Sequence, residues 1–132
     1  RRSRSIAKKI FQKRPINRVD QLVEILKQCT PPQKRNKTFA RVFQSFRIAV
    51  NKELDNLSSF LEKYLDCLKV GGKIIIISFH SLEDRIVKRS FKESSRKGQL
   101  NIITKKPIIA CEDDRIKNSR SKSAKLRCAV KL

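Results

Sequence analysis

Four consecutive isoleucines at residues 74–77 constrain the fold more than any other feature of the sequence. An apolar run without polar alternation is typical of a strand in a parallel sheet that is covered on both faces. Two glycines at residues 71–72 precede the run as a turn, and polar residues follow it from Ser78 onward. We therefore expect an α/β fold in which residues 73–78 form a buried strand.

Periodic apolar residues predict helices before this strand. Residues 1–13 and 17–29 carry apolar side chains three or four positions apart, and Pro15 separates the two segments. We expect Asn17 to cap the second helix and Val19 to lie on its buried side. A longer apolar stripe over residues 39–68 indicates one helix, or two helices joined near Asn51.

The segment after the isoleucine strand predicts another helix and two strands. The helix is expected to begin at Ser81, with Ser81 and Asp84 forming a capping box. Residues 101–105 and 124–130 are predicted to form strands that pair antiparallel, joined by a charged connection. A helix between two strands of one sheet favours a right-handed crossover.

The charge of the chain indicates a polyanionic partner. Lys plus Arg number 33 and Asp plus Glu number 12, which gives a formal net charge of +21. RNA or DNA is the usual partner of such a surface, and the alternative is a lysine-rich surface without a specific partner. No apolar run approaches the roughly 20 residues of a membrane span, so we expect no membrane interaction.

The four cysteines, at positions 29, 67, 111 and 128, include no CxxC pair, and the chain has a single histidine. This composition argues against a zinc site. We expect reduced, mostly buried thiols and no bound metal.

The end of the isoleucine strand is the candidate site for chemistry, because ligands of open α/β sheets bind at the carboxyl ends of strands. Glu83 and Asp84 follow in the first helical turn, where their interaction with the helix dipole would be a purely structural role. Asp84 is also placed for surface ion pairs with Arg85 or Lys88. The candidate residues are Ser78, Phe79, His80 and Ser81.

Four blocks of the sequence resemble the bacterial small-subunit (16S) ribosomal RNA cytosine N4-methyltransferases. They are RVFQSFRIAVNKEL (41–54), GGKIIIISFHSLEDRIVKR (71–89), TKKPI (104–108) and NSRSKSAKLRCAVK (118–131). That family methylates a cytosine of the decoding centre with S-adenosylmethionine, on a Rossmann-type sheet that carries a helical insertion. The resemblance implies that residues 1–50 belong to the helical insertion and residues 51–132 to the carboxyl-terminal part of the methyltransferase domain.

The resemblance also sets expectations for the cofactor and the partners. The family's glycine-rich cofactor loop and acidic ribose contact belong to its amino-terminal half, and no counterpart occurs here. We therefore expect S-adenosylmethionine to be bound mainly by residues outside this chain, and the isolated chain to be inactive. Residues 78–81 would line the pocket for the target base. The implied partner is small-subunit rRNA or an assembling small subunit, in the bacterial cytoplasm or an organellar matrix.

Three groups of residues are candidates for RNA contact. The alternative for the second group is a solvated helix face, and the alternative for the whole chain is a non-catalytic basic RNA-binding module of the same fold. A DNA-binding protein is disfavoured, because no helix-turn-helix spacing or zinc signature is present. The first group is Arg4, Lys34, Arg35 and Lys37, the second is Arg41, Gln44, Arg47 and Asn51, and the third is Lys105, Lys106, Arg120, Lys122 and Lys125.

Overall fold

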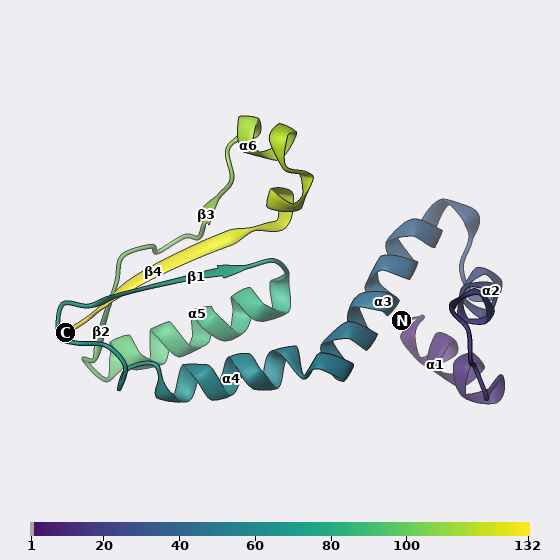
Figure 1. The fold of residues 1–132 in the computed structure, drawn as a ribbon, viewed down its shortest axis with the longest axis horizontal. Helices are drawn as coiled ribbons and strands as arrows, with labels where there is room; N and C mark the ends of the chain where they lie inside the picture. The colour runs from purple at the N-terminus through teal and green to yellow at the C-terminus, as the bar shows by residue number, and fades with distance from the viewer. Residues whose placement is uncertain (1) are drawn as a thin grey trace. The chain divides into compact units, whose positions relative to one another are not determined.

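The computed structural model describes residues 2–132, which divide into two compact units (Figure 1). The first unit ends at Lys52 and the second spans Glu53–Leu132. The first contains α1 (Ser3–Gln12), α2 (Val19–Cys29), the 3₁₀ turn η1 (Pro32–Lys34) and α3 (Arg35–Asn51). The second contains α4 (Glu53–Lys63), β1 (Lys73–Ser78), α5 (Ser81–Arg96), β2 (Leu100–Ile102), β3 (Ile108–Ile109), α6 (Glu112–Lys117), the 3₁₀ turn η2 (Ser119–Ser123) and β4 (Lys125–Lys131).

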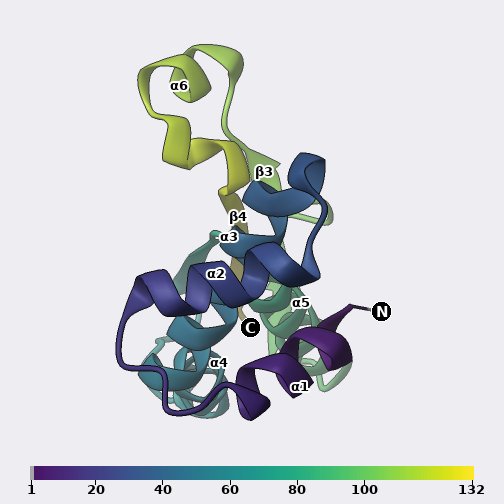
Figure 2. The ribbon, with the colours of Figure 1, turned by 90° about the vertical axis from the view of Figure 1, so that its right-hand side faces the viewer.

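The first unit is a small helical assembly in which α2 packs against both α1 and α3 (Figure 2). Its core consists of Ile6, Leu22 and Leu26. Two expectations for α2 were wrong. Val19 is 64% exposed, because it is the first residue of the helix and lies outside this core. The N-cap of α2 is Arg18 rather than Asn17. The side-chain oxygen of Gln21 accepts hydrogen bonds from the backbone amides of Asn17 and Arg18.

The long apolar stripe forms two helices, which confirms the second of the two expected arrangements. Lys52 adopts the left-handed conformation, with φ of 51°, and so ends α3 immediately before α4 begins at Glu53. The amide of Lys52 still donates to the carbonyl of Ile48, but the left-handed angles turn the chain after it away from the helical path.

The sheet has the strand order β1-β4-β2, with β3 paired to the other end of β4. β4 runs antiparallel to all three partners, so the predicted antiparallel pairing of the strands expected at residues 101–105 and 124–130 is confirmed, although the first is only the three-residue β2. β1 and β2 are therefore parallel to each other with β4 between them. The connection before β4 contains β3, α6 and η2, which were not predicted because these elements are short and mostly exposed (Figure 2).

The isoleucine strand differs from the expected one. β1 pairs antiparallel with β4, and its side chains alternate between two unlike faces. Ile74 is buried on the face that α5 covers, whereas Ile75 and Ile77 are 59% and 53% exposed on the other face. The parallel neighbour and the second covering layer that four isoleucines predict are thus absent from the described residues.

One face of the sheet carries the core of the second unit. α5 lies along this face and α4 packs against α5 (Figure 1). The side chains that meet there are Leu61, Tyr64, Ile74, Val87, Phe91, Leu100 and Ala129. This packing fixes the first turn of α5 against the end of β1, which is the place of the candidate site.

The cysteines are free, but the expectation that most are buried was wrong. Cys67 and Cys111 are exposed, and Cys29 and Cys128 are half-buried. None of the helices described over residues 2–132 has the length and apolar character that crossing a membrane requires.

Candidate functional site

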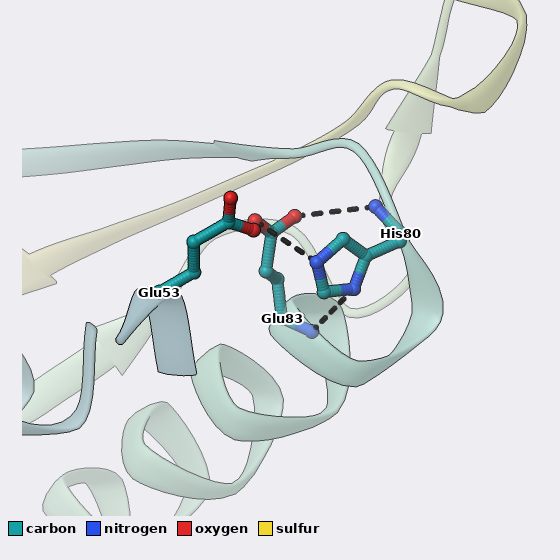
Figure 3. Close-up of side chains that lie close together, drawn as sticks. All are labelled: Glu53, His80 and Glu83. Atoms are coloured by element: carbon teal, nitrogen blue, oxygen red, sulfur yellow. Dashed lines mark hydrogen bonds and ion pairs between the residues drawn. The ribbon is translucent and has the colours of Figure 1, made fainter. Parts of the chain in front are cut away.

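His80 and Glu83 close the junction between β1 and α5 by reciprocal hydrogen bonds (Figure 3). The backbone amide of Glu83 donates to Nδ1 of His80 at 3.3 Å. Oε2 of Glu83 accepts from the backbone amides of Phe79 at 2.8 Å and His80 at 3.2 Å. The cap therefore lies one residue earlier than predicted, at His80 and Glu83 rather than Ser81 and Asp84. An extended backbone at His80, with φ of −144° and ψ of 165°, makes it the N-cap.

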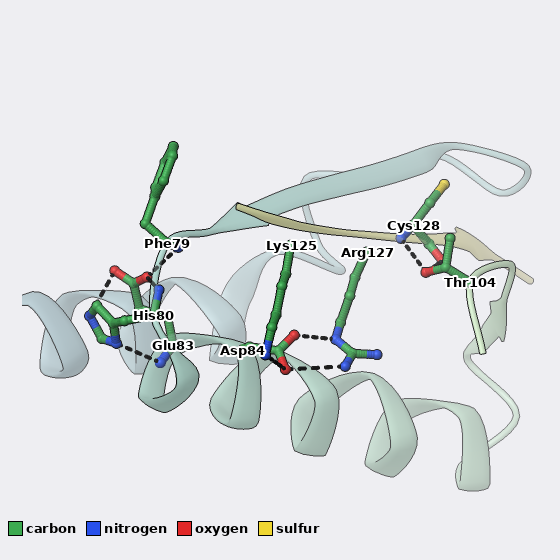
Figure 4. Close-up of polar contacts among 8 residues, drawn as sticks. All are labelled: Phe79, His80, Glu83, Asp84, Thr104, Lys125, Arg127 and Cys128. Atoms are coloured by element: carbon green, nitrogen blue, oxygen red, sulfur yellow. Dashed lines mark hydrogen bonds and ion pairs between the residues drawn. The ribbon is translucent and has the colours of Figure 1, made fainter. Parts of the chain in front are cut away.

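Asp84 faces the sheet instead of solvent. Its carboxylate accepts two hydrogen bonds from the Arg127 guanidinium of β4, at 2.7 and 3.3 Å, and lies 3.7 Å from Nζ of Lys125 (Figure 4). The hydrogen bond from Arg127 lowers the pKa of Asp84; burial opposes this effect, and the charges of Arg127 and Lys125 add to it. The expected surface pairing with Arg85 or Lys88 was therefore wrong, because the register of β4 places Arg127 under α5.

Glu53, the first residue of α4, brings a second carboxylate to this junction. The side chains of Glu53, His80 and Glu83 offer polar atoms that all lie within 4.8 Å of one another (Figure 3). The His80 side chain is only 10% exposed. Two acidic side chains thus surround a nearly buried imidazole at the end of β1.

The tautomer of a neutral His80 ring follows from its cap. Since Nδ1 accepts the Glu83 amide, the proton of the neutral ring is on Nε2. Nε2 lies 3.2 Å from Oε1 of Glu83. The two atoms are close enough to interact electrostatically, but they do not form a hydrogen bond. A metal on Nε2 would require Nδ1 to be protonated, and Nδ1–H would then face the Glu83 amide, another donor. The three residues have ligand types for a cation, but the observed cap does not fit one.

The four predicted strand-end residues point in different directions. Ser78, the last residue of β1, is 2% exposed, whereas Ser81 is exposed. Phe79 is 53% exposed, and its ring projects away from the His80–Glu83 cap (Figure 4). The structure thus leaves Phe79 and Ser81 accessible to a ligand and holds His80 behind them.

The glycines of the chain do not form a cofactor loop after a strand. Gly71 and Gly72 precede β1, and Gly98 follows α5. A phosphate- or nucleoside-binding turn needs its glycines between the end of a strand and the start of a helix, where the backbone approaches the ligand closely. Among residues 2–132, no glycine lies between the end of a strand and the start of a helix, so the described residues contain no glycine-rich turn of this kind.

Predicted RNA-contact residues of the first unit gather partly in one groove. A cavity of about 610 Å³ is lined by Lys34, Lys37 and Arg41, together with Arg2 of the α1 start. Arg4 is exposed on α1 outside this lining. Arg35 is half-buried, and its Nε has no hydrogen-bond partner among the described residues. Gln44, Arg47 and Asn51 lie further along α3, and none lines the groove.

The residues of the third predicted group differ in their exposure and partners in the second unit. Lys105 and Lys106 are exposed between β2 and β3, and Arg120 and Lys122 are exposed in η2. Lys125 is half-buried beside Asp84. Lys125 thus contributes to a structural ion pair, whereas the other four remain available to an external anion.

Sequence reasoning missed Glu53 and Arg127 at this junction. Each lies more than 25 positions from its partner, so only the packing of α4 and the register of β4 bring them near. Glu83 carried a detectable signal, because it lies three residues after His80, the spacing of a capping box.

The chain is similar to known proteins over almost its whole length. The chain is 52% identical to a ribosomal RNA small subunit methyltransferase H of Rippkaea orientalis, over 98% of this chain and 42% of that protein. It is 47% identical to the protein of the same name from Kosmotoga olearia, over 100% of this chain and 45% of that protein. The chain spans less than half the length of these curated relatives. The family model described as the MraW methylase family matches residues 1–132, and the chain therefore belongs to the MraW methylase family.

Proposed function

We propose that this chain is the carboxyl-terminal portion of an rRNA methyltransferase that transfers a methyl group from S-adenosylmethionine to N4 of a cytosine in the small-subunit decoding centre. The relatives of the chain are named as rRNA small subunit methyltransferases. The observation that carries the proposal is the end of β1, which reciprocal hydrogen bonds between His80 and Glu83 hold in place. S-adenosylmethionine supplies an electrophilic methyl group, and we assign its main binding site to residues outside this chain.

The open edge and the exposed apolar face of the sheet support the assignment of further structure to residues outside this chain. β1 has an unpaired edge among the described residues, and its outer face exposes Ile75 and Ile77. An open strand edge and an apolar face both require cover. We propose that further strands and helices of a Rossmann-type sheet supply it, with residues 51–132 as the closing edge and residues 1–50 as part of a helical insertion.

The junction is suited to holding a base rather than to removing its proton. The Glu83 carboxylate already receives two backbone amides and faces His80, and Nδ1 of His80 is engaged by the cap. Neither group is a free base. Phe79 is exposed and can stack on an unpaired base, as aromatic side chains do in RNA recognition. We assign Phe79 to base stacking and His80 to positioning of the loop that carries Phe79.

The test is methyl incorporation into small-subunit particles by the full-length protein. Phe79→Ala should lower incorporation, whereas Phe79→Tyr, which keeps the aromatic face, should retain most of it. Phe60→Ala serves as the matched control, because Phe60 is similarly exposed, at 51%, but belongs to α4 rather than to the strand end. Equal activity of Phe79→Ala and Phe60→Ala would refute the stacking role.

A second candidate function is a non-catalytic RNA-binding module. The net charge of +21 and the basic groove formed by Lys34, Lys37 and Arg41 favour it. RNA binding by the full-length protein without methyl incorporation into any assembly stage of the small subunit would favour this candidate over the enzyme.

A further inference from the structure

A cavity of about 340 Å³ lies between α5 and the segment that follows β2, and we call it the α5–β2 pocket. Its volume is within the range of small-ligand sites, roughly 300 to 1,000 Å³. Lys88 and Lys92 line it from α5, Lys105 lines it from the segment after β2, and Arg127 of β4 also lines it. Phe91 and Ile102 contribute apolar surface. The pocket is separate from the His80–Glu83 junction, which shares none of these residues.

The charge of the pocket has one sign. No carboxylate lines it, and four cationic side chains do, of which Arg127 is paired with Asp84 outside the lining. Among residues 2–132, none of its three lysines forms an ion pair with a carboxylate, although Lys97 and Lys27 elsewhere do so. Lysines that converge on a cavity without counter-charges repel each other, so an anion bound there removes that repulsion.

Arg127 gives the pocket a rigid element. The residue is 5% exposed, and Asp84 holds its guanidinium through Nε and Nη2. The remaining guanidinium nitrogen points away from Asp84 (Figure 4). A guanidinium fixed in this way is ordered before a ligand arrives, and its planar N–H groups match the oxygens of a phosphate.

We propose that the α5–β2 pocket binds the phosphodiester backbone of single-stranded RNA next to the site of modification. The inference rests on the proposed rRNA substrate. β2 pairs only with β4 among the described strands, so the pocket opens at an edge of the sheet where an extended strand can pass. Lys88 and Lys92 lie one helical turn apart, and Lys105 faces the same cavity from another element. Flexible lysines on both sides of the pocket, beside the fixed Arg127, suit a repeating backbone more than one compact anion.

The experiment compares two triple variants of the full-length protein with equal charge loss. The pocket variant is Lys88→Gln, Lys92→Gln and Lys105→Gln. The control is Lys63→Gln, Lys69→Gln and Lys117→Gln, which are exposed lysines outside the pocket. The probe is a labelled uridine oligonucleotide of about ten nucleotides, read by fluorescence anisotropy over a range of salt. Thermal melts verify that both variants fold.

The pocket variant should bind the oligonucleotide about tenfold more weakly at physiological salt, with a salt slope smaller by about 2.1, as expected for three lost phosphate contacts to a single strand. The control should change affinity about twofold at most. Equal losses in the two variants would overturn the proposal in favour of diffuse charge. A pocket variant that loses binding of inorganic phosphate but keeps RNA affinity would overturn the assignment to RNA. Because this experiment measures binding, it is independent of methylation. A full-length protein that methylates nothing would refute the proposed enzyme activity and leave the binding result unchanged.

Discussion

Replacing Asp84 with alanine should lower the free energy of unfolding by about 3 kcal/mol. The change leaves the Arg127 guanidinium nearly buried, with its side chain 7% exposed, and removes both of the hydrogen bonds that Asp84 accepts from it. The Asp84 side chain is itself only 13% exposed, so solvent screens the pair little. An unpaired charge at such a position costs far more than a surface ion pair contributes.

A double-mutant cycle isolates the pair. Asp84→Ala, Arg127→Ala and the double variant are measured by urea denaturation in the full-length protein. The double variant should be less destabilised than the sum of the two single variants, because it leaves no buried charge behind. Glu93 and Lys97 provide the control cycle, since they form a 2.9 Å pair whose side chains are 68% and 62% exposed. A coupling for Asp84 and Arg127 no larger than that of this exposed pair would refute the reasoning.

The same pair predicts a pH dependence with a definite sign. Because the hydrogen bond from Arg127 lowers the pKa of Asp84 in the folded protein, the carboxylate contributes its full stability above its unfolded pKa of about 3.9. That contribution is lost as pH falls through the folded value. The stability difference between the natural protein and Asp84→Asn should be constant near neutral pH and shrink in acid below about pH 4. A difference that stays constant into strong acid would contradict the assignment.

Two further predictions concern the cap and the two sheet faces. His80→Ala should cost about 1 kcal/mol of stability in thermal melts, whereas His80→Asn, which keeps a capping oxygen, should recover most of it. Ser81→Ala should be nearly neutral, because the exposed Ser81 is not the cap; a cost equal to that of His80→Ala would contradict this. Leu100→Ala, in the core at 1% exposure, should cost about 3 kcal/mol. In the full-length protein Ile77→Ala should cost a comparable amount by urea denaturation, and a negligible cost would refute the proposed cover over the outer sheet face.

Local sequence signals determined the longer helices and strands and their order, but not the short elements β3, α6 and η2. The glycine pair at residues 71–72, the isoleucine run and the polar residues after it predicted a strand followed by a helix, and β1 and α5 are found there. The apolar stripe over residues 39–68 predicted two helices as one of its alternatives, and the turn at Lys52 is where they meet. These features depend on periodicity and on backbone preferences of neighbouring residues, which a sequence displays directly.

The sequence also indicated the position of the candidate junction and a polyanionic partner for the chain. It did not predict which side chains contact each other at the junction. The strand end at Ser78 was identified from its position alone, and the charge excess indicated a polyanion. The cap was misplaced by one residue, because a histidine can serve as an N-cap acceptor although Ser, Thr, Asp and Asn are the usual ones. The type of a residue gives only its propensity to be an N-cap. The backbone angles decide which residue is the N-cap in the folded chain.

Tertiary structure alone decided which charges meet. Arg127 lies 43 positions after Asp84, and only the antiparallel register of β4 on β1 brings the guanidinium to the carboxylate. Glu53 reaches His80 because α4 packs on α5, and the lysines of the α5–β2 pocket converge because β2 lies beside that helix. Each of these contacts depends on sheet register and helix packing, which are set by burial of the shared core and leave no periodic trace in the chain.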